Sequence, residues 1–444
     1  MSKKREKKIQ DPDGLYSFLF NYVSFSVKNS YRKILHVGKE NIPQDGAIIF
    51  APNHTNTLMD ALVVLCYDYT PKVFVARADI FKNPLLAKIF HFLKIMPIMR
   101  QRDGFQAVKK NQEIINKSVD VLKDRIPFCI FPEGTHQAKY SSLPLSKGIF
   151  RIAFQAHELM PDVPLYIVPI GVRYGDFFRF RSTLRMEFGK PINVGEFIQA
   201  NENLTPQEQT NAMKDLLTER LHDTLFHIPN DDDYQATFEV CNAVEPFEME
   251  ALQKEKDGKK LHVLELQFQA NNRSLKHFEA LKNENPDKAQ KLLELGKEAG
   301  KLRKKKGIDF ESASVKKPFV SRLPRLLLTL LTLPYTLPAS LLASPVIGLC
   351  QFLFTKLKDP AFWNSVRFVI NLVVWPLLVL VYGIIGFCLL PWQWALVAIL
   401  LVMPAPFVAH ELWKTFRLIV SDLKLLKTKN LMKIYSEIRK LMAR

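Results

Sequence analysis

The chain has 444 residues, 48% of them hydrophobic and 24% charged, and its net charge is +18. This composition excludes an intrinsically disordered or collagen-like protein. The five cysteines include no Cys-x-x-Cys pair, which argues against a disulfide scaffold, a zinc ribbon or an iron–sulfur centre. The basic excess predicts an anionic partner, either nucleic acid or an acidic membrane surface.

The distribution of charge favours the membrane. The net charge is +5 in residues 1–33, +3 in 34–228, zero in 229–321 and +10 in 322–444. A nucleic-acid-binding protein usually carries its basic excess on a folded domain, interleaved with aromatic side chains. Because the excess lies at the two ends, we expect a phospholipid membrane as partner and no nucleic acid.

The first segment, residues 1–33, begins with the basic run MSKKREKK and continues into an apolar and aromatic stretch, Leu15–Val27. Polar residues interrupt this stretch, and it has neither a long apolar core nor a small-residue cleavage site, so it is not a signal peptide. We expect a basic N-terminal segment that lies at the membrane interface.

Residues 34–228 alternate between strand-like and helix-like patterns. Strands are expected at 47–51, 72–76, 95–99, 127–131, 165–172 and 183–189, and helices at 57–67, 83–93, 106–123, 148–159 and 205–227. This order predicts an α/β domain with a mixed sheet flanked by helices. Residues 229–321 are rich in Glu, Lys and Leu and are expected to form a charged helical insert or linker.

Two long uncharged runs, Leu326–Thr355 and Phe368–Ala409, predict a C-terminal all-α membrane domain at 322–410. About 20 apolar residues cross a bilayer as a helix, so a buried soluble hairpin is the weaker interpretation. The second run divides into spans 368–390 and 392–409, with basic outer flanks that predict cytoplasmic ends. In the first run, the prolines at 334, 338 and 345 are expected to break helical continuity. We therefore expect this run to form a re-entrant or in-plane hairpin at 326–355; one long tilted span is the alternative.

The tail, residues 411–444, is a basic amphipathic segment. Its apolar residues recur at helical spacing, at Leu412, Phe416, Ile419, Leu423 and Leu426, and again at Leu431, Ile434, Ile438 and Leu441. We expect a helix lying on an anionic leaflet. A helix that packs on protein is the alternative.

Two candidate motifs follow expected strands, where ligand sites of α/β proteins form. In the first, Pro52–Asp60, His54 in a strand-to-helix turn is suited to general-base chemistry, and Asp60 could orient it. A capping turn with an incidental histidine is the alternative. In the second, Ile98–Asp103, Arg100 offers a forked donor for phosphate, although most such arginines are solvated.

The third motif, Phe131-Pro132-Glu133-Gly134-Thr135-His136, directly follows the strand expected at 127–131. Gly134 allows a ligand to approach the backbone, and Glu133 and Thr135 supply polar contacts. Ser146-Lys147-Gly148 and Val168-Pro169-Ile170 come later in the chain.

These motifs in this order resemble the glycerophospholipid acyltransferase family, over residues ~34–228 within the α/β part. The FPEGT element is highly specific. The family usually has four residues between His and Asp, whereas five separate His54 from Asp60. The yeast-type glycerol-3-phosphate acyltransferases share the longer spacing and resemble this chain at Gly171-x-x-Tyr174 and Phe180-Arg181-Ser182. On a continuous helix this offset would turn the pair apart, so we expect His54 to lie before the helix.

The resemblance implies transfer of a fatty acyl group from acyl-CoA or acyl carrier protein to glycerol-3-phosphate or 1-acylglycerol-3-phosphate. His54 and Asp60 would be catalytic, without metal or cofactor. The substrate-binding set implied by the motifs is Asn53, Arg100, Glu133, Gly134, Thr135, Lys147 and Arg181. We expect an integral membrane protein with its catalytic domain on the cytoplasmic face of a bacterial inner membrane or the endoplasmic reticulum.

Three other functions stay open. A lysophospholipid-remodelling acyltransferase would use the same motifs on another acceptor. A non-catalytic lipid-binding membrane protein could keep the fold, although the intact His54, Asp60, Arg100 and Glu133 argue against this function. A metal hydrolase using His54 and Asp60 as ligands would need a third ligand, which the neighbouring sequence does not supply.

Overall fold

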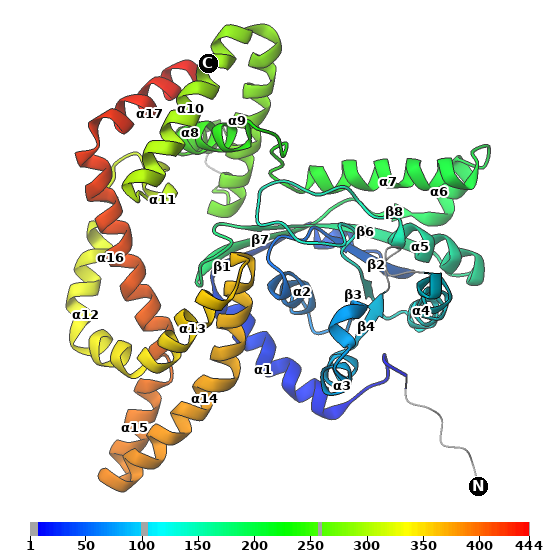
Figure 1. The fold of residues 1–444 in the computed structure, drawn as a ribbon, viewed down its shortest axis with the longest axis horizontal. Coiled ribbons are helices and arrows are strands. Elements are labelled where there is room, and N and C mark those ends of the chain that lie inside the picture. Colours follow the sequence, from blue (N-terminus) through cyan, green and yellow to red (C-terminus); the bar gives the residue numbers. More distant parts are fainter. Residues whose placement is uncertain (1–7, 99–104, 256–259, 444) are drawn as a thin grey trace. The chain divides into compact units, whose positions relative to one another are not determined.

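In the computed structural model, the described residues are 8–98, 105–255 and 260–443. The chain divides into two compact units, Met1–Leu225 and Phe226–Arg444. The first unit is α/β and the second is entirely helical among its described residues (Figure 1). The predicted fold class, a mixed sheet flanked by helices followed by an all-α part with apolar helices, is confirmed.

The sheet of the first unit contains eight strands within the described residues, in the order β1-β7-β6-β2-β5-β3-β4, with β8 pairing with β6. β2, β5, β3 and β4 are parallel to one another, and β7 runs antiparallel to β6. The bounds are β1 Tyr31–Val37, β2 Ala47–Pro52, β3 Val73–Arg77, β4 Ile95–Ile98, β5 Phe128–Cys129, β6 Leu165–Tyr174, β7 Ser182–Phe188 and β8 Ile192–Asn193. The carboxyl ends of β2 and β5 therefore meet at one edge of the sheet. The motif that contains His54 begins after β2, and the motif that contains Glu133 begins after β5.

Helices cover both faces of this sheet (Figure 1). One core lies between the sheet and α4, α5 and α7, because alternate residues of β2, Ile49 and Ala51, face these helices. Phe50 faces the opposite way and its ring packs against Tyr67, which follows α2. The helices are α1 Gly14–Ser30, α2 Leu58–Leu65, α3 Pro84–Phe92, α4 Phe105–Lys123, α5 Gly148–Leu159, α6 Val194–Ala200 and α7 Pro206–Asp223.

The N-terminal segment differs from its expected boundary. β1 begins at Tyr31, so a division at residue 33 falls inside a strand. The residues before α1 are tied to the α/β unit, since Lys94 Nζ donates hydrogen bonds of 2.8 Å to the carbonyls of Ile9 and Asp11. Leu15–Val27 lies within a helix, Gly14–Ser30, whose Tyr16, Phe20 and Val27 are buried. The polar residues between these apolar positions made the burial of one face difficult to predict.

The second unit begins with three long helices, α8 Tyr234–Glu255, α9 Val263–Glu284 and α10 Pro286–Lys306, and the short α11 Phe310–Ala313. They share an apolar core. A buried pair, Arg303 and Glu239, crosses from α10 to α8, and the Tyr435 hydroxyl also donates to Glu239. The expected insert at 229–321 is therefore helical and packs within the second unit.

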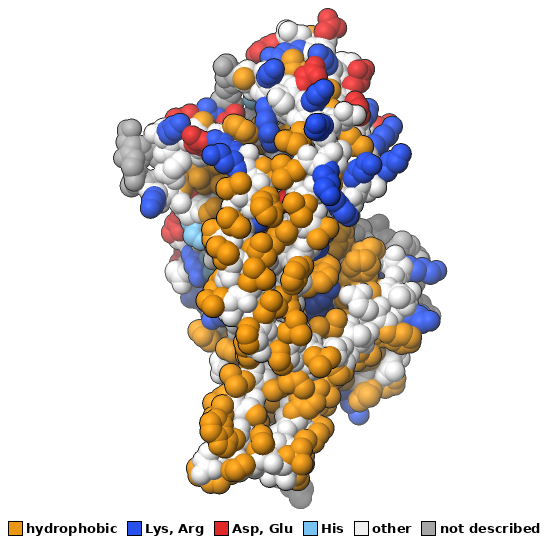
Figure 2. Space-filling view, turned by 90° about the vertical axis from the view of Figure 1, so that its left-hand side faces the viewer, with side chains coloured by type: hydrophobic (Ala, Val, Ile, Leu, Met, Phe, Trp, Pro, Cys, Tyr) orange, Lys and Arg blue, Asp and Glu red, His pale blue; other side chains and the backbone are white. Residues whose placement is uncertain are grey.

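The apolar helices follow: α12 Leu323–Leu342, α13 Ser344–Lys356, α14 Trp363–Leu389, α15 Trp392–Val402 and α16 Ala405–Lys427. Two helices, Val320–Leu342 and Pro360–Leu389, are long and apolar enough to cross a membrane; a third span is possible if α15 and α16, bent by 46°, count together. Figure 2 shows apolar side chains covering this face of the helices, with basic side chains gathered toward one end.

The prolines of the first uncharged run do not act alike. Pro334 and Pro338 lie inside α12, so the expectation that they break helical continuity is wrong for both. The break between the two helices comes at Ala343. Pro345 lies in the first turn of α13, where the missing backbone N–H costs little because it would have no partner within the helix. Figure 1 shows the chain changing direction at this break, so that α13 leads away from the end of α12. The re-entrant hairpin stays a prediction.

The basic tail forms the end of α16 and α17 Lys429–Met442. In α16 part of the expected stripe is exposed, at Phe416, Leu423 and Leu426. In α17, however, Leu431, Ile434 and Ile438 are buried in the core shared with α8 and α10. The expectation of an interfacial helix is therefore wrong for α17, because protein already covers its apolar stripe.

Candidate active site

The turn that carries His54 connects β2 to α2. Asn53 holds its first residue: the Asn53 side chain accepts from Val172 N at 2.7 Å and donates to Val172 O at 3.1 Å. The turn ends at Thr57, whose φ of +48° is unusual for a β-branched residue. Such backbone strain persists only where surrounding contacts fix the conformation, as at functional sites.

His54 and Asp60 meet across this turn. The distance from His54 Nδ1 to Asp60 Oδ2 is 2.8 Å, and the same oxygen accepts from the backbone amides of Thr55 at 2.8 Å and Asn56 at 2.6 Å. The six-residue offset is possible because α2 begins only at Leu58, as expected for a histidine in the turn. Since a carboxylate only accepts, it fixes the proton of a neutral ring on Nδ1 and leaves Nε2 as the basic nitrogen.

The ring of His54 lies between aromatic neighbours. Phe131 stacks on it at a centroid distance of 4.4 Å, and the ring of His136 stands edge-on at 5.6 Å. The His54 side chain is 18% exposed, while Asp60 is completely buried. The base is therefore reached from a limited direction while its partner is shielded from water.

Glu133 lies beside the same turn. Its Oε1 accepts from the backbone amide of His54 at 3.3 Å, and burial raises the pKa of Glu133 to about 8. The amides of His54 and Leu143 oppose this rise, and the charge of Asp60 adds to it. At neutral pH Glu133 therefore carries a proton, so its carboxyl can donate as well as accept.

The remaining residues of the third motif lie at the surface of this edge. Gly134 has a φ of +67°, and both Gly134 and Thr135 are exposed. The amide of Ser146 donates to Pro132 O at 2.7 Å, which brings the start of α5 next to the motif. Lys147, also exposed, thus lies one residue from a direct contact with this turn.

Two predicted substrate ligands have other partners in the structure. Both polar atoms of the buried Asn53 side chain are bonded to Val172, so Asn53 holds the turn. Arg181 donates to the carbonyls of Asn29 at 3.0 Å and Tyr31 at 3.3 Å, and thus anchors the end of α1. Substrate binding by either stays a prediction. Arg100 lies outside the described residues, two positions after the end of β4.

One close neighbour of the pair had no predicted role. The hydroxyl of Tyr174, at the end of β6, donates to Asp60 Oδ1 at 2.7 Å. The two residues are 114 positions apart, so no local pattern could have indicated the contact. Among the described residues, no cluster of three or more His, Cys, Asp and Glu side chains could hold a metal ion.

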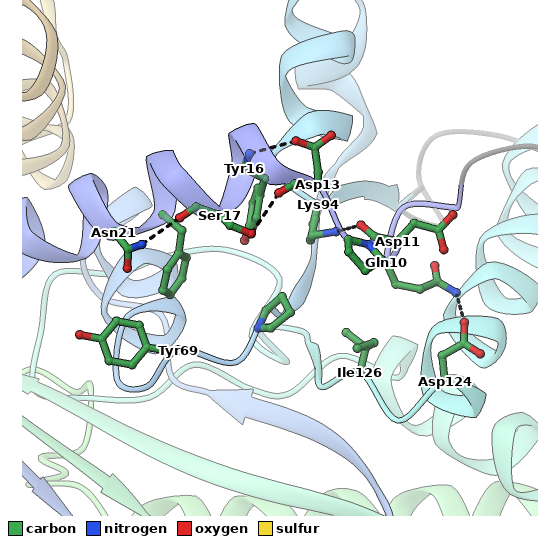
Figure 3. Close-up of a pocket in the computed structure, with 13 residues that line it drawn as sticks. Gln10, Asp11, Asp13, Tyr16, Ser17, Asn21, Tyr69, Lys94, Asp124 and Ile126 are labelled. Carbon is green, nitrogen blue, oxygen red and sulfur yellow. Dashed lines mark hydrogen bonds between the residues drawn. The ribbon is translucent and has the colours of Figure 1, made fainter.

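A hollow of about 450 Å³ lies elsewhere in the first unit (Figure 3). Tyr16 and Phe20 of α1 contribute to its wall, together with Lys94 and Ile126. Lys94 and Ile126 precede β4 and β5, so the hollow lies at the amino ends of parallel strands. His54 and Glu133 follow the carboxyl ends of β2 and β5, at the opposite edge.

Comparison with known proteins agrees with the motifs. Residues 33–173 match the family model described as Acyltransferase. This part of the chain is an acyltransferase-family domain. The match includes His54, Asp60, Arg100, Glu133 and Lys147 but ends just before Tyr174. The predicted resemblance to glycerophospholipid acyltransferases is thereby confirmed at the level of the family.

Curated relatives of the acyltransferase domain include a glycerol-3-phosphate acyltransferase and a 1-acyl-sn-glycerol-3-phosphate acyltransferase. The chain is 36% identical over 88 residues to glycerol-3-phosphate O-acyltransferase 1 of Saccharomyces cerevisiae, which covers 20% of this chain and 12% of that protein. It is 24% identical over 163 residues to a probable 1-acyl-sn-glycerol-3-phosphate acyltransferase of Mycoplasma pneumoniae, which covers 35% of this chain and 57% of that protein. The matches thus span less than two thirds of these relatives.

A solved structure is also similar to this chain. It is the 1-acyl-sn-glycerophosphate acyltransferase PlsC of Thermotoga maritima, with 18% identity and a TM-score of 0.35, covering 48% of this chain and 83% of that chain.

Proposed function

We propose that this protein is a membrane-bound O-acyltransferase that transfers a fatty acyl group to a hydroxyl of glycerol-3-phosphate or 1-acylglycerol-3-phosphate. The observation that carries the proposal is the 2.8 Å contact between His54 Nδ1 and the buried Asp60 carboxylate, inside a domain of the acyltransferase family. The donor would be acyl-CoA or acyl carrier protein, and no cofactor takes part.

The proposed chemistry is a single displacement. His54 Nε2 removes the proton from the acceptor hydroxyl while that oxygen attacks the thioester carbonyl carbon. The Asp60 carboxylate stabilises the imidazolium that forms. The carbon–sulfur bond then breaks, and the leaving thiolate takes the proton back from His54. No acyl-enzyme is needed, so no nucleophilic side chain is invoked.

The acceptor phosphate requires cations near this edge of the sheet. Lys147, at the start of α5 and next to the Pro132–Gly134 turn, is one proposed ligand, and Arg100 is the other. The protonated Glu133 would bind the glycerol part, with Gly134 and Thr135 exposed around it. Basic charge here would also favour a phosphorylated acceptor over a neutral one.

Membrane association is supported by the apolar helices of the second unit. The acylated product is an amphiphile, as is the acceptor 1-acylglycerol-3-phosphate, so a catalytic domain at the membrane surface would exchange these lipids without passage through water. The basic flanks at Arg322, Arg325, Lys356, Arg367 and Lys414 support a cytoplasmic orientation under the positive-inside rule.

The test is product analysis with the purified full chain in phospholipid vesicles. We expect an acylated phosphoglyceride from acyl-CoA or acyl carrier protein with one of the two acceptors. His54→Ala should lower kcat by ~10²–10⁴, as expected for loss of a general base. His91→Ala, which removes an exposed histidine of α3, is the matched control and should keep the wild-type rate.

The acceptor panel also separates the alternatives. Selective use of lysophosphatidylcholine or lysocardiolipin would indicate a remodelling enzyme. A wild-type protein that binds lipid but forms no product with any donor and acceptor would indicate a non-catalytic lipid-binding protein. A His54→Ala variant with the wild-type rate would exclude the proposed mechanism.

A further inference from the structure

The carboxylate of Asp60 receives more hydrogen bonds than a simple pair with histidine requires. Oδ2 accepts from His54, Thr55 and Asn56, whereas Oδ1 accepts from the Tyr174 hydroxyl. The donors on Oδ2 all come from the turn itself. The Tyr174 hydroxyl thus ties the Asp60 carboxylate to β6, the strand that also holds Asn53 of the same turn.

Tyr174 is a donor in a fixed position. It is completely buried, and its ring lies 5.9 Å from that of Tyr31 on β1. Burial raises the pKa of the Tyr174 hydroxyl, so this hydroxyl remains a protonated donor to Asp60 across the pH range of the enzyme.

A hydroxyl bonded to a carboxylate acts on it in two ways. It fixes the rotation of the carboxylate, here with Oδ2 toward His54. It also draws negative charge toward Oδ1, which weakens the stabilisation that Asp60 gives to a protonated imidazole. We propose that Tyr174 is a positioning residue that orients Asp60 and sets the basicity of His54.

This inference rests on the proposed function, in which His54 is the base. Within the part of the chain that the structure describes, the other titratable groups near the pair are Glu133 and His136 from the motif after β5, and Tyr31 from β1. None of them is removed by a substitution at Tyr174. A change in the titration of His54 on loss of the hydroxyl would therefore report the bond to Asp60.

The direction of the effect follows from the charge. In Tyr174→Phe the carboxylate loses a donor and keeps more negative charge, which favours the imidazolium. The acidic limb of kcat/KM should therefore move up by about 0.5–1 pH unit. At high pH, where His54 is neutral in both proteins, kcat should fall about 10-fold because the pair is less well oriented.

The matched control is Tyr140→Phe. The Tyr140 hydroxyl donates to the backbone carbonyl of Tyr174 at 2.8 Å, so this variant removes a tyrosine hydrogen bond close by without touching Asp60. It should leave the pH profile unchanged. The titration of His54 is measured directly by NMR on histidine-labelled full chain, with His54→Gln identifying the signal.

The two readouts separate failure of this inference from failure of the proposed function. If Tyr174→Phe loses activity equally at every pH and the His54 titration does not move, Tyr174 is only a packing residue. If the wild type shows no acyl transfer, the proposed function fails, while the NMR titration still decides the role of Tyr174. If Tyr174→Phe does not fold, 3-fluorotyrosine placed at position 174 keeps the hydroxyl and makes it a stronger donor to Asp60, so the titration of His54 should move in the opposite direction; no shift would overturn the inference.

Discussion

At the scale of single residues, the site combines two buried carboxyls in different surroundings. Asp60 is surrounded by donors from His54, the turn amides and Tyr174. Glu133 accepts from the turn through Oε1, and its Oε2 has no hydrogen-bond partner among the described residues. We therefore expect them to have different tasks: Asp60 would stabilise the protonated ring of His54, and Glu133 would hold a proton at neutral pH.

Glu133→Gln tests this assignment. The folded-state pKa of Glu133, about 8, lies above its ordinary value of 4.5, so folding favours the protonated form. The contribution of the protonated carboxyl to the free energy of unfolding is fully present below about pH 4.5. It is lost as the pH rises through about 8. Glutamine does not titrate, so the melting temperature of the variant relative to wild type should increase between about pH 5 and pH 9.

The measurement is thermal unfolding of the full chain across this pH range. Glu158→Gln, at an exposed position of α5, is the control and should show a constant difference from wild type. A constant difference for Glu133→Gln as well would mean that Glu133 ionises like a surface glutamate.

At the scale of elements, α1 has two apolar faces. Tyr16, Phe20 and Val27 are buried against the α/β unit, whereas Leu15, Phe18, Tyr22 and Phe25 are exposed at spacings of three and four residues, and therefore form one stripe. Four exposed residues on α3 or at its end, Leu85, Leu86, Ile89 and Leu93, are also apolar, and the rings of Tyr16 and Phe92 join the two helices at 6.1 Å. Each large apolar side chain moved from water into lipid would contribute roughly 1.5–3 kcal/mol.

We expect the exposed stripe of α1 to contact lipid. A spin label at Phe25→Cys in the full chain should be accessible to oxygen, which dissolves in lipid, and protected from a water-soluble nickel complex. The control label at Ser17→Cys, on an exposed polar position of the same helix outside this stripe, should show the reverse. Both variants need Cys388→Ala, because Cys388 is exposed. Equal accessibility to nickel at both positions would show that α1 does not enter the interface.

At the scale of the whole molecule, the basic charge and the apolar surface are arranged along the sequence to suit a membrane protein. The first and last segments carry most of the +18, and the α/β segment carries only +3. The apolar helices α12, α14 and α15 expose large side chains that water would not favour. We therefore expect the charge to serve mainly in orienting the protein on an anionic membrane surface.

The orientation can be tested by labelling in sealed vesicles. If α12 and α13 form a re-entrant hairpin, thiol reagents should reach Ser321→Cys and Lys358→Cys from the same side of the membrane. Gln393→Cys, in the first turn of α15 directly after the connection from α14, is the control and should react from the opposite side. The background is again Cys388→Ala. Labelling of positions 321 and 358 from opposite sides would mean that the first run crosses the bilayer once.

Local patterns in the sequence determined most of the elements of the α/β unit. Runs of hydrophobic residues followed by polar turns indicated β2, β3, β4 and β6. They could be predicted because strand burial and turn formation each depend on a few neighbouring residues. Helix starts were similarly clear, as at α7, where Thr205 and Glu208 form a capping box. The sequence did not indicate β1, which lies beside β7, a strand about 150 residues away along the chain.

For the site, the sequence by itself determined which residue types stand at the ends of β2 and β5, and hence the resemblance to the family and the candidate general base. Only the tertiary structure decided which atoms meet. The late start of α2 lets His54 reach Asp60, Val172 occupies Asn53, and Tyr174 completes the coordination of Asp60 from a strand far along the chain. The physical reason is that a hydrogen bond between distant segments depends on sheet order and burial, which no local run of residues encodes.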